Sequence, residues 1–518
     1  MLKLSNLRAE IGFSSDTVQG KIEKLIGTEI KNLKIAKRAI DARRKKDVHY
    51  VLTAEFEVEN ENRILSKSIA NLERKNDEHY IFPNGKLKTR PIIVGTGPAG
   101  LFSALFLARC GAKPIVLERG EKVDDRQKSV DSYFQGGKLN EESNIQFGEG
   151  GAGTFSDGKL NTGTKNIRIR TVLEEFVSHG ASPDILVNSK PHIGTDVLRK
   201  VVKSMREEII SLGGEVRFNT KMTDLKIEDG EIKGVYAGDE FIPSDTVVLA
   251  IGHSARDTLL MLRDKGIRME KKPFSIGARI EHKQDFIGNA MYGDFYKKLP
   301  AADYKMAVHL NNGRSLYTFC MCPGGYVVAA ASEKDTIVTN GMSYSDRSGE
   351  NANSAVLVGI TPDDFPGDDV LSGMYLQREI EKKAYEVGKG KAPCQTLGSF
   401  LFGKENTVST VKPTYKPGVN MCDISKVFPD FIADSLKEGL LLMNKKIPGF
   451  AMSDAILTAP ETRSSSPVKM IRDENMMLSV KGLYSAGEGG GFAGGITSSA
   501  VDGIRVAEAI IVNAKKTV

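Results

Sequence analysis

Residues 95–100 read GTGPAG and directly follow the apolar run at residues 91–94. A helix-forming stretch, LFSALFLARCG, comes next, and a second apolar run, PIVLE, ends at Glu118, eighteen residues past the last glycine. Strand, glycine turn, helix, strand and acid follow one another at the spacing of a βαβ unit that binds a dinucleotide. The N-terminus of such a helix offers free N–H groups and partial positive charge to the phosphates.

Each residue type in this unit has a physical role in dinucleotide binding. Gly95 and Gly97 let the backbone turn sharply and approach a pyrophosphate, and Gly100 allows the helix to pack closely on the strand. Glu118 can accept hydrogen bonds from ribose hydroxyls. The candidate cofactor-binding residues at this end of the chain are Gly95, Gly97, Pro98, Ala99, Gly100, Glu118 and Arg119.

The far end of the chain carries a second glycine-rich turn, at residues 482–511, GLYSAGEGGGFAGGITSSAVDGIRVAEAII. A short strand is predicted at residues 483–486, and a helix is predicted to begin near residues 495–496. This resembles the second flavin fingerprint of glutathione-reductase-type flavoproteins, in which a Gly–acid pair holds the ribityl chain and the helix N-terminus stabilises negative charge on the reduced flavin. The family usually has Asp where this chain has Glu488. The resemblance implies FAD, bound in part by Gly487, Glu488, Gly494, Gly495 and Ile496.

From about residue 90 onward, the chain resembles a bacterial group of uncharacterised FAD-dependent dehydrogenases within the glutathione-reductase-like FAD/NAD(P)-binding superfamily. The motifs that carry this resemblance are LERG (117–120), FGEGGAGTFSDGKL (147–160), LAIGHSARDT (249–258), CMCPGG (320–325), ETRSSSPV (461–468) and AGEGGGFAGGITSSAVDGI (486–504). The resemblance implies a glycine loop packed against the pyrophosphate and isoalloxazine, and a phosphate contact for Arg126, for which a solvated helix face is the alternative. The further residues assigned to the cofactor are Gly150, Gly151, Thr154, Lys159 and Gly252.

The middle of the chain lacks a second dinucleotide fingerprint. Between residues 195 and 460, no glycine motif stands between a strand and a helix with a suitably placed acid. NAD(P)H, if it is the electron donor, is therefore expected to dock transiently on the flavin face.

The cysteines give no clear redox motif. No cysteine lies between Cys110 and Cys320, and the close pair Cys320–Met–Cys322 is predicted to lie on a strand. A spacing of two puts both sulfurs on the same face of a strand, where a disulfide would be strained and two thiols alone make a poor zinc site. Packing as small hydrophobic residues is the main interpretation, and a thiol lying over the flavin is the alternative.

Positive charge is concentrated at the N-terminus. Residues 1–90 contain 19 Lys and Arg against 13 Asp and Glu, whereas the rest of the chain balances at 53 of each. A strand, a helix opened by residues 14–16, and two strands flanking the basic turn at residues 43–46 predict a compact ferredoxin-like α+β unit. No aromatic platform accompanies the basic turn, so we interpret it as a solvated turn and expect no nucleic-acid partner.

The composition and patterning predict a cytoplasmic protein of several domains. Five cysteines make no disulfide framework, charge breaks the N-terminus too early for a signal peptide, and no apolar run has membrane-spanning length. We expect an α/β fold with a small basic domain (1–88), an FAD-binding Rossmann-like domain (89–272), a β-rich substrate domain (273–457) and a C-terminal FAD-binding segment (458–518).

The function predicted from these features is an FAD-dependent oxidoreductase that transfers hydride between flavin N5 and an unidentified small-molecule substrate. Lys159 is a candidate for stabilising the reduced flavin, with phosphate or solvent as its alternative partners. Arg463 is a candidate anchor for a substrate carboxylate, with a salt bridge to Glu461 as the alternative. His253 is interpreted as a packing or capping residue. The alternative functions are a flavin-dependent monooxygenase and an interaction module with a structural FAD.

Overall fold

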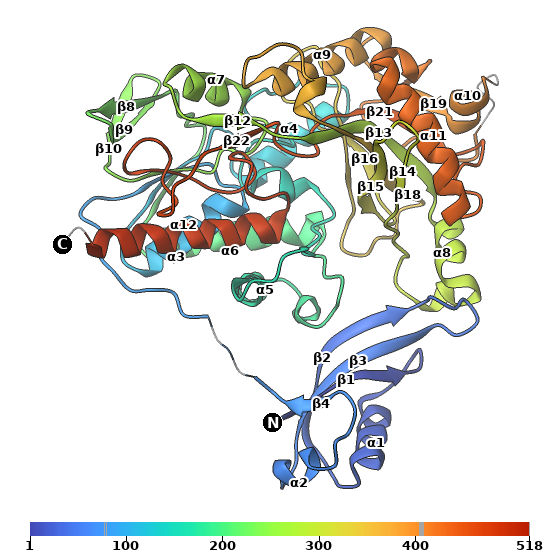
Figure 1. Cartoon of the computed structure of the whole chain (residues 1–518). Coiled ribbons are helices and arrows are strands. Elements are labelled where there is room, and N and C mark those ends of the chain that lie inside the picture. Colours follow the sequence, from blue (N-terminus) through green and yellow to red (C-terminus); the bar gives the residue numbers. More distant parts are fainter. Residues whose placement is uncertain (77, 79, 404–408, 517–518) are drawn as a thin grey trace.

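The computed structural model describes residues 1–76, 78, 80–403 and 409–516. Figure 1 shows a main body built around two large sheets, with a smaller N-terminal unit protruding below it. None of the described helices has both the length and the apolar character needed to cross a membrane.

A five-stranded parallel sheet, in the order β23-β11-β5-β6-β7, forms one half of the main body. Its strands are Leu483–Ser485 (β23), Val247–Leu249 (β11), Ile92–Val94 (β5), Ile115–Leu117 (β6) and Glu215–Arg217 (β7). The three central strands consist of Ile, Val and Leu and are buried on both faces, as expected for a parallel sheet covered on both sides.

Helices cover one face of this sheet and a β-meander with a helix covers the other. The first layer contains Pro98–Arg109 (α3), Arg168–Ser178 (α5), Thr195–Ser211 (α6) and Ile496–Lys516 (α12). The second contains Asp224–Glu228 (β8), Glu231–Ala237 (β9), Glu240–Pro243 (β10) and Arg256–Asp264 (α7). A Cβ at Gly503 would lie 2.2 Å from the carbonyl oxygen of Ala99, so a glycine is needed where α12 crosses α3.

A seven-stranded sheet, in the order β14-β15-β18-β13-β21-β19-β20, forms the other half. Its strands are Ala307–His309 (β14), Ser315–Cys322 (β15), Asn351–Ile360 (β18), Phe274–Lys283 (β13), Ile456–Glu461 (β21), Ala392–Thr396 (β19) and Val419–Met421 (β20). The helices beside it are Gln284–Tyr292 (α8), Ser372–Val387 (α9), Leu397–Phe402 (α10) and Asp430–Lys446 (α11). Its hydrophobic core is separate from the cores on the two faces of the parallel sheet.

Short elements join the two halves. Met269–Lys271 (β12) pairs with Val468–Met470 (β22), and Tyr326–Ala329 (β16) pairs with Thr339–Met342 (β17). Val123–Phe134 (α4) and the 3₁₀ turn Gly151–Phe155 (η1) follow β6. The other 3₁₀ turns are Pro183–Leu186 (η2), Gly293–Lys298 (η3), Pro362–Asp364 (η4) and Ile424–Val427 (η5).

The N-terminal unit is a four-stranded antiparallel sheet in the order β2-β3-β1-β4. Its elements are Leu2–Ala9 (β1), Ser15–Ile26 (α1), Lys31–Asp41 (β2), His49–Glu57 (β3), Glu61–Leu65 (α2) and Leu72–Arg74 (β4). Ser14 caps α1 by accepting a hydrogen bond from the Thr17 N–H. Arg38 of β2 donates to the Asn188 side chain of the main body, so the two parts are in contact.

Candidate functional site

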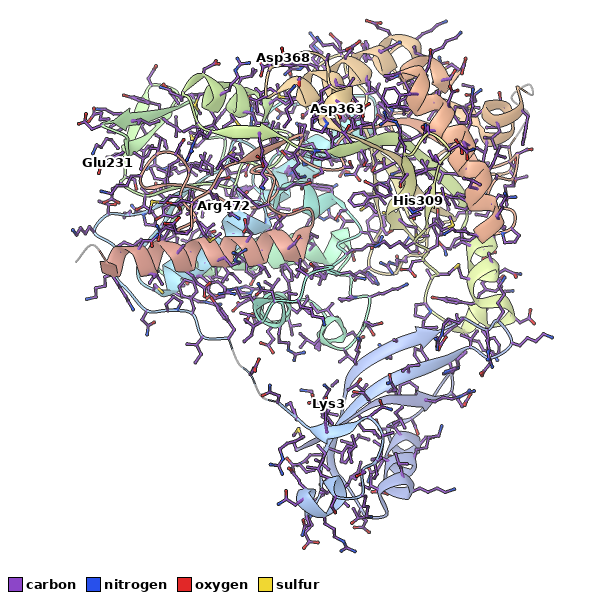
Figure 2. All side chains as sticks on the ribbon, viewed as in Figure 1. Lys3, Glu231, His309, Asp363, Asp368 and Arg472 are labelled. Atoms are coloured by element: carbon purple, nitrogen blue, oxygen red, sulfur yellow. The ribbon has the colours of Figure 1, made fainter. Side chains whose placement is uncertain are left out.

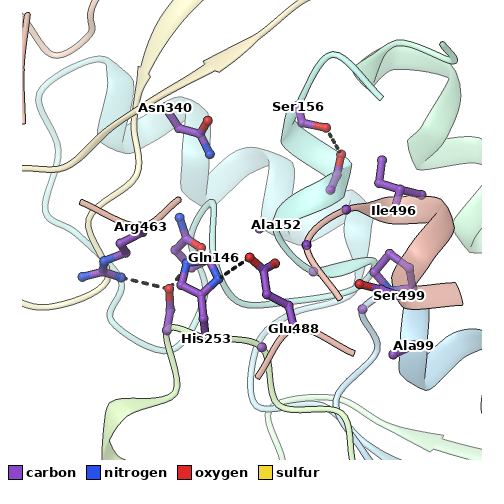
Figure 3. A pocket seen from close by; sticks show the side chains of 18 of the residues that line it. Ala99, Gln146, Ala152, Ser156, His253, Asn340, Arg463, Glu488, Ile496 and Ser499 are labelled. Carbon is purple, nitrogen blue, oxygen red and sulfur yellow. Dashed lines mark hydrogen bonds and ion pairs between the residues drawn. The ribbon is translucent and has the colours of Figure 1, made fainter. Parts of the chain in front are cut away.

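A cavity of about 500 Å³ lies where the parallel sheet meets the seven-stranded sheet. Its walls come from the segments that follow β5, β6, β11 and β23, together with Cys320, Glu461 and Arg463 from the other half. Because the strands of a parallel sheet all end at one edge, these segments meet although they are far apart in the sequence. Figure 3 shows Asn340 and Arg463 at one end of the view and Ile496 and Ser499 at the other.

The glycine turn after β5 has the geometry that the sequence predicted. Gly95 has φ +101°, and a Cβ there would lie 2.4 Å from the Ala250 carbonyl oxygen. A Cβ at Gly100 would lie 1.9 Å from the Gly95 carbonyl oxygen. Gly97 precedes α3 without a side-chain cap, and together with Pro98 and Ala99 it lines the cavity. The first N–H groups of α3 are therefore not capped by a side chain at the cavity wall, as a phosphate site requires.

Glu118 holds the neighbouring loops in place. Its Oε2 accepts hydrogen bonds from the Thr96 N–H (2.9 Å) and hydroxyl (2.5 Å), and its Oε1 accepts from the N–H groups of Gly120 (2.9 Å) and Gly148 (3.0 Å). The side chain is buried and also lines the cavity. The carboxylate that was predicted to meet a ribose therefore also fixes the turn before α3.

Arg119 lines the same part of the cavity but is held by acidic partners. Its guanidinium donates two hydrogen bonds of 2.9 Å to Asp257 and one of 2.7 Å to Glu142, and it stacks 4.1 Å from the ring centre of Phe147. Because Asp257 and Glu142 pair with its charge, Arg119 presents a planar guanidinium to the cavity and not an unpaired cation.

Arg126 does not occupy either of the positions predicted for it. The side chain is fully buried, and its guanidinium donates to the carbonyl oxygens of Asn144, Ile145, Glu149 and Gly151 at 2.7–3.0 Å. Burial lowers the pKa of this guanidinium to about 10, so it stays charged at neutral pH. The phosphate contact and the solvated helix face are therefore both corrected: Arg126 holds the glycine-rich loop together from within.

The glycine-rich loop contributes some of its predicted residues to the cavity and not others. Gly151 lines the wall, whereas Gly150 and Thr154 do not. A Cβ at Gly150 would lie 2.0 Å from the Thr154 hydroxyl oxygen, and that hydroxyl donates to the Glu149 carbonyl at 3.2 Å. Gly150 and Thr154 therefore shape η1 rather than contact a ligand. This is a second correction to the predicted site.

The C-terminal turn brings an acid and a histidine together in the cavity. Glu488 Oε1 lies 3.3 Å from His253 Nδ1, and the two side chains point toward one another in Figure 3. His253 Nε2 is buried and has no hydrogen-bond partner among the described residues. An imidazole nitrogen without a partner in a cavity wall is available to a bound molecule. The prediction of packing or capping for His253 did not include this contact.

The N-terminus of α12 forms the wall opposite the β-rich half. Gly494, Gly495 and Ile496 line the cavity, and so does Gly252, where an added Cβ would meet nothing within 4 Å. Gly487 lies behind the wall, where its N–H donates to Asp502 at 2.9 Å.

Asp502 is held in turn by Arg472, which lies above α12 in Figure 2. The Arg472 guanidinium also lies 3.3 Å from the ring centre of Phe492. This arrangement fixes the turn before α12 and so fixes the position of the helix N-terminus.

Arg463 is not free to anchor a substrate carboxylate. It pairs with Glu381 through two hydrogen bonds of 2.9 and 3.0 Å, and its remaining nitrogen donates to the hydroxyls of Ser254 and Ser332. The alternative pairing with Glu461 is also wrong, because Glu461 pairs with Arg279. The structure corrects both predictions for Arg463, which joins the cavity wall to α9.

Lys159 and Cys320 approach the same part of the cavity from opposite halves of the molecule. Lys159 Nζ lies 3.6 Å from Asp157, is buried, and has no hydrogen-bond partner among the described residues. Cys320 has φ +45°, and the pairing of β15 with β18 shifts between Phe319 and Cys322. The simple alternation predicted for the cysteine pair is therefore broken. The sequence offered no signal for this, because the shift depends on pairing with a distant strand.

The residues that line the cavity fit an extended dinucleotide cofactor. The N-terminus of α3, the first residue of α12 and two open glycine positions, Gly252 and Gly494, line one space. His253, whose Nε2 has no hydrogen-bond partner among the described residues, lines the same space. The glycines leave room for a ligand to approach the backbone, and the helix termini favour its anionic groups.

Comparison with known proteins agrees with this fit. Residues 88–240 match the model of an FAD binding domain, and residues 273–464 match the C-terminal-domain-like family of FAD-dependent proteins. Residues 1–57 match a domain of unknown function.

Similarity to solved structures is weak. CtdE in complex with FAD is 10% identical, with 84% of this chain and 91% of that chain covered and a TM-score of 0.32. The flavin-dependent brominase Bmp2 is 13% identical, with 82% and 79% covered and a TM-score of 0.38. Glycine oxidase from Bacillus cereus is 12% identical, with 82% and 97% covered and a TM-score of 0.31. Likeness of this size says nothing about the activity of this chain.

One relative matches along almost the whole length. An uncharacterised protein from Clostridium beijerinckii is 45% identical over 524 residues, covering 98% of each chain. This protein carries an FAD-binding domain and belongs to the same family as the Clostridium beijerinckii protein.

Proposed function

We propose that the protein is an FAD-dependent oxidoreductase that transfers hydride between the flavin and a small-molecule substrate. The observation that carries this proposal is the single cavity shared by the turn at Gly95–Gly100 and the N-terminus of α12, which are about 400 residues apart in the sequence. The turn at Gly95–Gly100 is suited to phosphates, and the N-terminus of α12 is suited to a delocalised anion. FAD presents both groups in one molecule.

The residues at each end would hold different parts of the cofactor. Gly97, Pro98 and Ala99, at the start of α3, would face the pyrophosphate, and the carboxylate of Glu118 would accept from the adenosine ribose. Gly495 and Ile496, at the start of α12, would face the polar edge of the isoalloxazine ring. When bound, FAD supplies reversible two-electron chemistry, and the protein positions the substrate and tunes the local charge.

Lys159 is the residue that we assign to charge stabilisation. Lys159 lines the cavity, and its amine has no hydrogen-bond acceptor in the part of the chain that the structure describes. Asp157, which lies 3.6 Å from the amine, also pairs with Arg347 at 2.6 Å. The ammonium group is therefore available to an anionic ligand, whether the reduced cofactor or the substrate.

We also propose an electron donor, a location and a domain division for the protein. We propose NAD(P)H as a transient electron donor and a cytoplasmic location, and we keep the four predicted domain ranges. The β2-β3-β1-β4 order of the N-terminal sheet supports a ferredoxin-like assignment for the first range. The five-stranded parallel sheet supports the glutathione-reductase type for the FAD-binding part.

The visible spectrum tests the proposed function. Purified protein, alone or after incubation with FAD, is expected to show bound-flavin absorption that NADH or NADPH bleaches in the absence of oxygen. A flavin that neither nucleotide reduces would contradict NAD(P)H as the donor. Incorporation of oxygen from labelled O₂ into a substrate would instead favour the monooxygenase alternative.

A further inference from the structure

The backbone at Cys320 is held in a conformation that ordinary residues avoid. Strand β15 pairs regularly with β18 as far as Phe319, and the register then shifts before Cys322. Cys320 occupies the left-handed region with φ +45°, which is unfavourable for a residue with a Cβ. Such conformations persist only where the surrounding structure fixes them, and they cluster at functional sites.

This register shift places the two neighbouring cysteines in different environments. Cys320 lines the cavity, whereas Cys322 is completely buried behind it. The Cys322 thiol donates to the Cys320 carbonyl oxygen at 3.2 Å, so its side chain turns back toward the residue that faces the cavity. Cys320 can therefore contact a ligand in the cavity, whereas the Cys322 thiol is buried beside Cys320.

Two basic side chains lie beside this pair: Arg279, which is paired with Glu461, and Lys159, which lies 3.6 Å from Asp157. Arg279 Nη1 donates to the Cys320 carbonyl oxygen at 3.1 Å and lies 3.9 Å from Cys322 Sγ. Lys159 brings a buried amine that has no hydrogen-bond partner among the described residues. Interaction with the Cys322 side chain, together with the charges of Lys159 and Arg279, holds the pKa of Cys320 below its ordinary range. Interaction with the Cys320 side chain, together with burial, raises the pKa of Cys322.

A thiolate beside a protonated thiol is the arrangement that a dithiol redox pair needs. The thiolate is the reactive form of a cysteine, and cationic surroundings favour it. The partner thiol carries the proton that must leave when the second sulfur reacts. The other described cysteines outside this pair, Cys110, Cys394 and Cys422, do not line the cavity.

We propose that Cys320 and Cys322 form a redox pair that exchanges two electrons with the flavin. The inference rests on the proposed function, because it requires FAD in the cavity. The thiolate of Cys320 and the thiol of Cys322 join in a disulfide, and the S–H bond of Cys322 breaks. The two sulfurs release two electrons and one proton, which oxidised FAD accepts to become the reduced anion. The reverse step uses two electrons and one proton from reduced FAD to restore the thiolate and the thiol.

The experiment counts electrons in the flavin-loaded full chain. The protein is treated with the thiol oxidant diamide, freed of reagent, and titrated with dithionite without oxygen while the flavin absorption is followed. Wild type is expected to take up four electrons per flavin, two for the cofactor and two for the disulfide. The C322S and C320S variants are expected to take up two. The control variant C422S, which removes a thiol outside the cavity, is expected to retain four.

Mass spectrometry of the same samples reads the pair directly and independently of the flavin. A Cys320–Cys322 cross-link after diamide treatment, reversed on reduction of the flavin, supports the proposal. A yellow wild type that takes up two electrons, with both cysteines still open to alkylation, would overturn the redox pair while leaving the flavin site intact. A protein that cannot bind FAD at all would overturn the proposed function, and the inference with it.

Discussion

Arg279 and Glu461 form an ion pair with two parallel hydrogen bonds of 2.6 and 2.7 Å, and both side chains are buried in the wall behind Cys320. The two residues lie on the paired strands β13 and β21, so the sheet itself sets their separation. Together, Arg279 and Glu461 add no net charge to the wall. Either residue without the other would leave a buried charge there.

Replacing Glu461 with glutamine should therefore destabilise the fold, because it leaves the Arg279 guanidinium buried without its counter-charge. We expect a loss of about 3 kcal/mol in the free energy of unfolding, measured by urea denaturation. The control is Glu73→Gln, which breaks an exposed pair with Lys3 and should cost less than about 1 kcal/mol. Equal losses in the two variants would contradict this account of the wall.

Gly97→Ala should separate cofactor binding from folding. Gly97 has φ −64°, and an added Cβ would meet only the Gly151 Cα, at 4.0 Å, so the methyl group fits the protein without a ligand. A poorer helix cap should lower stability by less than about 1 kcal/mol. FAD affinity should fall at least about tenfold, because the methyl group stands where the backbone must approach the phosphates.

The control for that variant is Gly359→Ala, in β18. An added Cβ there meets nothing within 4 Å, and the residue lies outside the cavity. Its FAD affinity should equal that of wild type. A G97A protein that binds FAD as tightly as G359A would place the phosphates elsewhere.

Arg126→Met should destabilise the protein even though it touches no predicted ligand. The change leaves four buried carbonyl oxygens without their donor, and we expect a loss of about 3 kcal/mol by urea denaturation. Arg170→Met, which removes an exposed i,i+4 pair with Glu174, should cost less than about 0.5 kcal/mol. If the two variants unfold at the same urea concentration, the Arg126 hydrogen bonds do not stabilise the fold.

Cys320 should react with iodoacetamide faster than an ordinary thiol below pH 8. Its pKa is lowered, so the thiolate is already formed at pH values where the other cysteines are protonated, and its rate should fall only as the pH drops below that lowered value. Peptide mass spectrometry at pH 6 to 9 measures the rate for each cysteine. Replacing Lys159 with methionine should move the Cys320 profile to higher pH. A Cys320 profile that matches that of Cys110 would contradict this electrostatic account.

Local patterns predicted the parts of the structure that depend on local geometry. The spacing from Gly95 to Glu118 identified the βαβ unit because turn, helix and acid lie within one short segment. Residues 14–16 identified the start of α1 because Ser14 caps that helix with its own side chain. Each signal is carried by residues that are neighbours in the chain.

The partners of charged side chains could not be predicted in the same way. Arg463 pairs with Glu381, 82 residues away, rather than with nearby Glu461, because α9 packs beside β21. Arg126 meets carbonyl oxygens of a loop whose path depends on its own glycines. The bulge at Cys320 likewise depends on β18. These contacts follow from tertiary packing, which a short window of sequence does not record.

Calorimetric titration of FAD into the flavin-free protein tests whether one molecule occupies both ends of the cavity. The account predicts one FAD per chain, bound at least about tenfold more tightly than either riboflavin or ADP, since each of these fills only one end. Riboflavin or ADP binding as tightly as FAD, or no heat of FAD binding at all, would contradict it.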